Sequence, residues 1–257
     1  TAFIFHHQQL TGFKPVFFRL VDGHEADKDL ALRRNLQRFD TTAQDAFKKI
    51  PGSPIAYWTS SLVRNIFENF KSISDVASPV VGLQTGDNGK FLRLWHEVDI
   101  IGIGFDFADS AAANHSKRKW FPYNKGGDYR RWFGNQEWVV NWEKDGKEIR
   151  TFGAENGGKA RSRAQNVEYY FQPSVSWSFI SSSYFGVRFF PKGFIFDVAG
   201  SSAFPKAGMS HFALATFLCS AVAPKLMSTM NPTLNFQAGN VGQLPFLHLD
   251  TGHIAET

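Results

Sequence analysis

The order of apolar patterns along the chain is the feature that most limits its fold. Residues 25–39, 42–49 and 60–70 space apolar side chains as helices do, and residues 211–230 form a longer apolar helical run. Between them lie short strand-like runs separated by glycine, proline, asparagine and aspartate. Because strands and helices do not alternate regularly, the pattern favours an α+β fold with a mixed, mainly antiparallel sheet over a doubly wound one.

The strand-like runs are short. They cover residues 15–20, 55–58, 80–83, 91–98, 137–142, 147–152, 174–180, 185–190, 193–198 and 243–247. Asp145-Gly146 between two such runs predicts a β-hairpin, because this dipeptide suits the tight turn that joins antiparallel strands. Ser60 or Ser61 is expected to cap one helix and Thr41 another, and Pro224 is expected to kink the last one. We predict a helical lead-in over residues 1–50, a main β-rich domain over 51–248 closed by a helix, and a tail over 249–257.

Composition narrows the class of protein. The chain of 257 residues is 43% hydrophobic and 20% charged, which favours a packed core over global disorder. Its single cysteine, Cys219, excludes an intramolecular disulfide framework and a cysteine-based zinc cluster, and its apolar neighbours predict burial. Ser220, Pro224 and Lys225 interrupt the most apolar stretch, and no signal-peptide pattern is present. These features predict a cytoplasmic protein without a membrane span.

No catalytic motif stands out. The eight histidines do not have metal-site spacing, and neither a GxSxG nor a Walker A sequence occurs. Gly102 and Gly104 lack the third glycine of a dinucleotide-binding turn. The Asn231-Pro232-Thr233-Leu234 segment shares only its first two letters with the Asp/Asn-Pro-Pro-aromatic signature of amino-group DNA methyltransferases, and a turn is the better interpretation. We therefore predict no catalytic residue and no metal site in this chain.

Basic residues gather in two stretches of a chain whose net charge is +5. Clusters in loops can follow a phosphate backbone, although a solvated protein surface is the competing interpretation. The candidate phosphate-binding residues are Lys117, Arg118, Lys119, Lys125, Arg130, Arg131, Arg161 and Arg163.

Two segments mix glycine, amide, basic and aromatic residues. Residues 82–91 offer Gln84 and Asn88, and residues 120–132 offer Asn124 among aromatic rings that can stack on bases. Together with Arg93 these three amides are the candidate base contacts. A glycine-rich hairpin turn and an aromatic loop packed on the core are the structural alternatives.

These segments carry a resemblance. Five further stretches belong with them: Lys49-Ile50-Pro51-Gly52-Ser53-Pro54-Ile55-Ala56-Tyr57-Trp58, Glu137-Trp138-Val139-Val140-Asn141-Trp142, Trp177-Ser178-Phe179-Ile180, Gly193-Phe194-Ile195-Phe196-Asp197-Val198-Ala199-Gly200 and Asn231-Pro232-Thr233-Leu234-Asn235-Phe236. In these segments the chain resembles the adenine-specific DNA methyltransferases of BREX phage-defence systems, the PglX family. The match covers most of residues 12–247 but includes no catalytic motif. The resemblance therefore implies a target recognition domain that lies downstream of catalysis.

The resemblance also implies a function. This part would recognise a sequence in double-stranded DNA and position the target adenine for a methyltransferase domain outside this chain, which uses S-adenosylmethionine. The chain alone would be inactive, and residues 1–50 would be the helical connector. The missing methyltransferase domain and other BREX proteins are candidate partners. The alternatives are a protein-docking module within a phage-defence complex and an aromatic carbohydrate-binding domain, of which the second does not explain the paired basic clusters.

Overall fold

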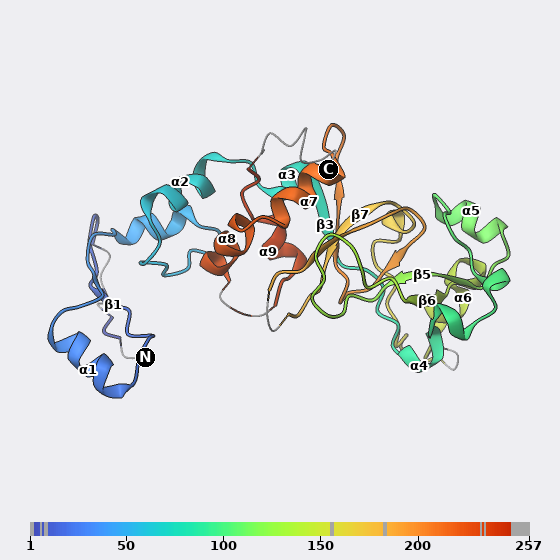
Figure 1. Ribbon diagram of the computed structural model, residues 1–257, viewed down its shortest axis with the longest axis horizontal. Coiled ribbons are helices and arrows are strands. Elements are labelled where there is room, and N and C mark those ends of the chain that lie inside the picture. The colour runs from blue at the N-terminus through green and yellow to red at the C-terminus, as the bar shows by residue number, and fades with distance from the viewer. Residues whose placement is uncertain are drawn as a thin grey trace. The chain divides into compact units, whose positions relative to one another are not determined.

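The computed structural model describes residues 3–5, 7, 10–154, 157–181, 184–231, 233 and 235–247 (Figure 1). The chain divides into two compact units, Thr1–Phe70 and Lys71–Thr257. This boundary lies after Phe70, whereas the sequence led us to expect it at residue 50; the predicted tail, 249–257, lies outside the described residues. Helices and mostly antiparallel sheets are both present, so the predicted α+β class is confirmed.

The first unit holds little regular structure. It contains β1 (Phe17–Phe18) paired with β2 (Arg38–Phe39), the helices α1 (Glu25–Arg33) and α2 (Ser61–Asn69), and the 3-10 helix η1 (Gln44–Lys49). Ser60 caps α2 as predicted, because its side chain accepts a hydrogen bond from the Val63 amide at 3.3 Å.

Three predictions for the first unit are wrong. The helix expected to reach residue 39 ends at Arg33, and Asn35 and Gln37 have positive φ values of 51° and 53° that interrupt a right-handed helix. Ala43 rather than Thr41 precedes η1. Residues 55–58 form no strand, and Tyr57 and Trp58 lie in a turn.

The second unit contains two four-stranded sheets. One has the order β3 (Ala77–Val80), β10 (Ser202–Pro205), β7 (Ser174–Trp177) and β8 (Val187–Phe190), and every pair in it is antiparallel. The helices α3 (Ile73–Val76), α7 (His211–Leu218), α8 (Val222–Met230) and α9 (Ala238–Gly242) gather at this sheet (Figure 1).

The other sheet positions most of the predicted site. Its order is β4 (Leu92–Leu94), β6 (Trp138–Asn141), β5 (Trp120–Asn124) and β9 (Ile195–Phe196), and only the β5–β9 pair is parallel. The connecting helices are α4 (Asn88–Phe91), η2 (Trp95–Glu97), η3 (Ile100–Gly102), α5 (Ser110–His115), α6 (Glu143–Thr151) and η4 (Val167–Tyr169).

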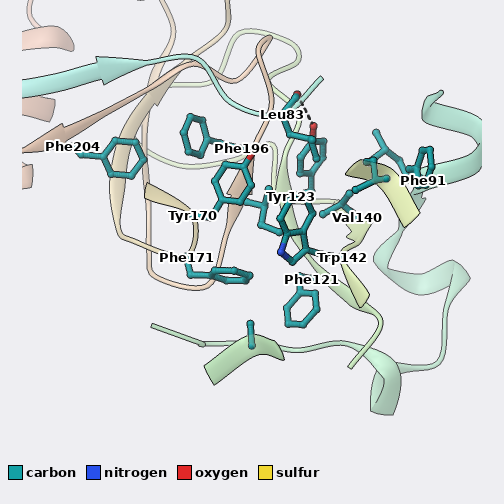
Figure 2. Close-up of a cluster of buried hydrophobic side chains, with 14 residues drawn as sticks. Leu83, Phe91, Phe121, Tyr123, Val140, Trp142, Tyr170, Phe171, Phe196 and Phe204 are labelled. Carbon is teal, nitrogen blue, oxygen red and sulfur yellow. Dashed lines mark hydrogen bonds between the residues drawn. The ribbon is translucent and has the colours of Figure 1, made fainter. Parts of the chain in front are cut away.

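Aromatic side chains fill the core beside this sheet (Figure 2). Phe121, Phe171 and Tyr123 are at most 1% exposed. The Phe121 and Phe171 rings meet edge to face with centroids 5.5 Å apart, a favourable geometry for aromatic quadrupoles. Ten of the 27 phenylalanines are buried, so core packing explains part of the aromatic content.

The predicted Asp145-Gly146 hairpin is wrong. Lys144, Asp145 and Gly146 all have positive φ values, between 54° and 69°, and lead into the helical residues of α6. A Cβ on Gly146 would lie 2.6 Å from the Trp142 ring, so glycine permits this close approach. Residues 147–152 therefore form no partner strand, and β6 pairs with β4 and β5 instead.

The long apolar run 211–230 forms two helices rather than one kinked at Pro224. The break follows Leu218, and the Ser220 Oγ accepts hydrogen bonds from the Val222 and Ala223 amides at the start of α8. Pro224 fits the first turn of α8, where its missing N–H costs no helical bond. Within the described residues no single helix meets the length and apolarity of a membrane span; α7 and α8 do so only jointly, across a 68° bend.

Candidate nucleic-acid interface

A polar hollow brings together residues from three distant segments. It has a volume of about 260 Å³ and is lined by Gln84, Thr85, Gly86, Asp87, Asn88, Lys125 and Asp197; we call it the Gln84 hollow. Three of its lining residues, Gln84, Asn88 and Lys125, are among the predicted contacts. Lys125 is distant from the other two in sequence. The parallel β5–β9 pair places it beside Asp197, and the Leu83–Asp197 bridge brings residues 84–88 to the same place.

The loop that lines the hollow is fixed by its own hydrogen bonds. The Thr85 hydroxyl donates to Asn88 Oδ1 at 2.6 Å, and Asp87 Oδ1 accepts from the Lys90 amide at 3.0 Å. Gly86 has φ +73°, and a Cβ there would lie 2.7 Å from the Arg161 carbonyl oxygen. Any larger residue would therefore push the loop away from the segment that carries Arg161.

Arg163 lies beside Gln84. The two residues exchange backbone hydrogen bonds at 2.9 and 2.8 Å as an isolated antiparallel bridge. Directly opposed residues in such a pair point to the same face with Cβ atoms about 5 Å apart. Both side chains are exposed, so a guanidinium accompanies the Gln84 amide at the rim of the hollow. Arg161 is also exposed, and its guanidinium lies 5.1 Å from the centre of the Phe152 ring.

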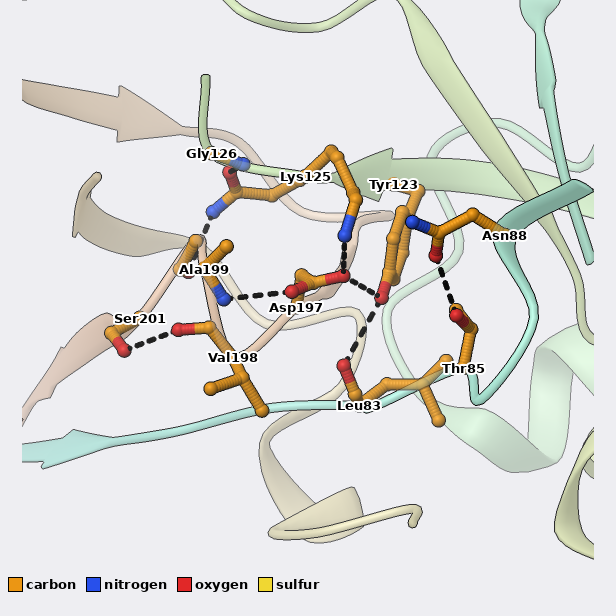
Figure 3. A network of polar contacts seen from close by, with 12 residues as sticks. Leu83, Thr85, Asn88, Tyr123, Lys125, Gly126, Asp197, Val198, Ala199 and Ser201 are labelled. Carbon is orange, nitrogen blue, oxygen red and sulfur yellow. Dashed lines mark hydrogen bonds and ion pairs between the residues drawn. The ribbon is translucent and has the colours of Figure 1, made fainter. Parts of the chain in front are cut away.

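A buried carboxylate organises the floor of the hollow (Figure 3). Asp197 is 5% exposed and accepts hydrogen bonds from the Tyr123 hydroxyl at 2.7 Å, the Lys125 ammonium at 2.6 Å and the Ala199 amide at 2.7 Å. The Tyr123 hydroxyl is also 3.2 Å from the Leu83 carbonyl oxygen, but its one proton serves the shorter, charged contact. Burial, and next the Asp197 charge, raise the pKa of Tyr123 well above its ordinary value.

This network determines what Lys125 can do. Its side chain is 26% exposed, and its charge is matched by Asp197, so a phosphate contact at Lys125 would compete with an existing ion pair. The exposed amides of Gln84 and Asn88 have donor and acceptor atoms that suit base edges. The hollow is therefore better suited to reading polar edges than to neutralising phosphate.

A second group of candidates surrounds Trp120 at the start of β5. The Arg93 guanidinium and the Lys119 ammonium lie 5.8 and 5.4 Å from the centre of the Trp120 ring. Arg93 also donates to the Gly89 carbonyl oxygen at 2.6 Å, which holds it against the sheet. Lys117 is exposed and Arg118 is half-buried in the turn between α5 and β5.

The two groups flank one strand. Lys119 directly precedes β5 and Lys125 directly follows it. At 3.4 Å per residue their Cα atoms are roughly 20 Å apart, the length of about six base pairs of B-DNA. Because Asp197 already matches the charge of Lys125, Lys119 is the stronger candidate phosphate contact of the two.

The third group lies in the loop 127–134, which is attached to the other sheet. Trp132 exchanges backbone hydrogen bonds with Val187 and Phe189 at 2.8 and 2.9 Å. Arg130 and Arg131 are both exposed, but Arg131 also donates to the Cys219 carbonyl oxygen. Cys219 itself is buried, as predicted.

Asn124 requires a correction. It is 0% exposed; its Nδ2 donates to Ser176 Oγ at 2.7 Å and to the Gly200 carbonyl oxygen at 3.0 Å, and its Oδ1 accepts from the Gly126 amide at 3.2 Å. In this arrangement the side chain joins β5 to the strands around it and is not available to a base. The sequence could not reveal this, because an asparagine among aromatics suits both roles.

Sequence reasoning missed Tyr123 and Asp197. Their only signal was a single carboxylate in the otherwise apolar run 193–198, which needs a partner if the run is buried. Within the described parts of the chain, no three His, Cys, Asp or Glu residues lie close enough together to hold a metal ion.

No family model matches the chain. It is 34% identical over 263 residues to the adenine-specific methyltransferase PglX of Lacticaseibacillus casei (strain Zhang), a match that covers 100% of the chain and 22% of that protein. It is 38% identical over 250 residues to the adenine-specific methyltransferase BrxX of Escherichia coli O9:H4 (strain HS), covering 96% of the chain and 19% of that protein.

The chain corresponds to one part of the PglX-type adenine-specific methyltransferases. The resemblance found from the sequence is thereby confirmed. The chain spans about one fifth of the length of these relatives. What a whole PglX or BrxX protein does is therefore not carried to this chain by the match alone.

Proposed function

We propose that this chain is the DNA-sequence recognition domain of a BREX-type N6-adenine DNA methyltransferase. It would bind double-stranded DNA and position the target adenine for a catalytic domain outside this sequence. The observation that carries the proposal is the Gln84 hollow, which is lined by Gln84 and Asn88. Arg163, from a distant segment, pairs with Gln84 at its rim. Amides that discriminate base edges and a cation that contacts phosphate are the two elements of sequence-specific binding.

The basic residues support contact with a polyanion. Lys117, Lys119, Arg130, Arg161 and Arg163 are exposed at loops or strand ends of the second unit. Each phosphate that such a residue neutralises releases condensed counterions, so binding should weaken steeply with salt. Arg118, Lys125 and Arg131 are weaker candidates because burial or an internal contact already engages them.

S-adenosylmethionine belongs to the proposed catalytic part rather than to this one. The glycine-containing loop 85–89 opens only the one-turn helix α4, and Asp87 caps it. We derive no methyl-transfer step from this chain and propose that it is inactive alone.

A matched set of variants tests the proposal. Arg163→Gln and Lys117→Gln each remove one cation, and Arg34→Gln removes an exposed cation from the first unit as a control. We expect each of the first two variants to weaken duplex binding at every sequence and to reduce the slope of log affinity against log salt by about one unit. Equal slopes in all four proteins would contradict the proposed phosphate contacts.

The base-reading role needs a separate readout. Asn88→Ala and Gln84→Ala should each cost about 1–3 kcal/mol of discrimination at one base position while changing the salt slope little. Selection from a random duplex pool measures that preference. An unaltered preference in both variants would refute the assignment of the Gln84 hollow to base reading.

A protein-docking module is the second candidate function, favoured by the first unit. α1 has no buried residue, and Phe13, Leu36 and Ile55 are exposed by 45–52%. Several large apolar side chains that are exposed on one unit are typical of a surface that binds another protein. Salt-insensitive association with the remainder of a PglX-type protein, without any duplex binding, would favour docking over DNA recognition.

A further inference from the structure

A second hollow lies on the sheet that carries the candidate interface. It has a volume of about 330 Å³, and its lining includes Trp95, Phe105, Trp138, Gln136 and Lys192; we call it the Trp95 hollow. Trp95 and Phe105 are 48% and 49% exposed although both are large apolar side chains. Its size falls within the range of small-ligand sites, and aromatic rings supply several of its walls.

Strand register connects this hollow to the basic group around Trp120. Val139, which lines the hollow, is the register partner of both Arg93 on β4 and Pro122 on β5. Paired residues point to the same face of a sheet, as do residues two apart on one strand. Arg93 and Trp120 therefore share the face on which the hollow opens.

The rings that line the hollow are carried by an anchored backbone. The Trp95 amide donates to the Glu137 carbonyl oxygen at 2.9 Å, and the Gly104 amide beside Phe105 donates to the Trp120 carbonyl oxygen at 2.8 Å. A Cβ on Gly104 would lie 2.5 Å from the Phe121 ring, so this segment sits directly on the core. Because the backbone is fixed, both rings can receive a flat ligand with little further ordering.

One polar group in the lining lacks a partner. The Gln136 Nε2 is buried, and it makes no hydrogen bond. A buried amide donor without an acceptor costs about 1–3 kcal/mol. A ligand acceptor would recover this free energy only if the Gln136 side chain turned its covered Nε2 toward the hollow. Lys192 adds a positive charge to the same lining, and Asp106 adds one acidic group.

We infer that the Trp95 hollow binds an unpaired nucleobase of a DNA strand. Aromatic rings stack on bases, and the Gln136 amide can turn toward a polar base edge. Lys192 in the lining, with Arg93 on the same face of the sheet, offers cations for the flanking phosphates. An apolar peptide would satisfy the rings but would offer no acceptor to the Gln136 amide and no anion to Lys192. This base would be distinct from the adenine that a catalytic domain modifies. The inference rests on the proposed function only in taking DNA as the ligand.

The test compares two DNA probes by fluorescence anisotropy. One is a fully paired duplex, and the other is the same duplex with a single extra, unpaired nucleotide. The measured quantity is the ratio of the two affinities. We expect a ratio of about ten in the native protein, and a ratio near one in Trp95→Ala and in Phe105→Ala.

Matched controls separate stacking in the hollow from general loss of aromatic surface. Phe70→Ala and Phe212→Ala remove rings that are 49% and 50% exposed and do not line the hollow. Both should keep the native ratio. A native ratio of one, or a ratio that Trp95→Ala and Phe105→Ala leave unchanged, would overturn the inference.

The design also distinguishes this inference from the proposed function. If the paired duplex does not bind at all, the proposed duplex recognition fails, and a single-stranded oligonucleotide becomes the probe. If that strand binds the native protein and Phe212→Ala but not Trp95→Ala, the result would still support the Trp95 hollow. Absence of strand binding would refute it as well.

Discussion

Asn124 and Asn88 give the sharpest test of which amides serve the fold and which serve binding. Asn124→Ala deletes two donated hydrogen bonds and one accepted from the Gly126 amide, all inside the protein. At about 1 kcal/mol for each bond, the free energy of unfolding should fall by about 3 kcal/mol. Asn88→Ala loses one hydrogen bond, from Thr85, at an exposed position and should cost about 1 kcal/mol or less.

Urea denaturation followed by tryptophan fluorescence measures both variants. Six of the seven tryptophans lie in the second unit, so the signal reports the part that contains both asparagines. With a slope of about 2–3 kcal/mol per molar urea, Asn124→Ala should shift the midpoint down by roughly 1 M at unchanged slope. A native midpoint for Asn124→Ala would refute its structural role and restore it as a candidate base contact.

Three further predictions concern single side chains. Because folding raises the pKa of Tyr123, its contribution to stability is complete below the pKa of tyrosine in the unfolded chain, near 10, and is lost as the pH rises above that value. The melting temperature should therefore fall at alkaline pH, and Tyr123→Phe should make this fall smaller. An equally large fall in Tyr123→Phe would contradict this role of Tyr123. Arg188 is 0% exposed, its Nε has no partner among the residues that the structure describes, and burial lowers its pKa to about 10. Arg188→Met should therefore equal or exceed native stability in thermal denaturation, and a loss of 3 kcal/mol or more would contradict this interpretation. Gly86→Ala, which adds a backbone clash to a positive φ, should destabilise by more than Gly52→Ala, which adds only the φ cost of about 1 kcal/mol; equal losses on urea denaturation would refute the tight packing of that loop.

Local patterns predicted the fold best where they depended on short-range chemistry. The α2 cap at Ser60, the α+β class and the antiparallel strands at 174–177 and 187–190 follow from capping and alternation alone. The Asp145-Gly146 hairpin failed because the same dipeptide also suits a left-handed turn that enters a helix, and close packing on Trp142 decides between them. Tertiary contact, which is absent from a local pattern, made that difference.

The candidate site was predictable in its residue types but not in its grouping. The exposed positions of Gln84 and Asn88 agree with a binding role, whereas Asn124 is consumed by internal hydrogen bonds. The pairing of Lys125 with Asp197 joins residues 72 positions apart, so no spacing rule could reveal it. The missed Tyr123 and the misjudged Asn124 both lie on β5, a strand that residue patterns did not predict.

Duplex binding by the native protein as a function of salt tests the central claim most directly. Fluorescence anisotropy with a random-sequence duplex pool at several salt concentrations gives the slope of log affinity against log salt. We predict micromolar or tighter binding at low salt and a steep negative slope of several units, one for each phosphate contact. Absence of binding at low salt, or affinity that does not change with salt, would contradict the claim that this chain is a DNA recognition domain.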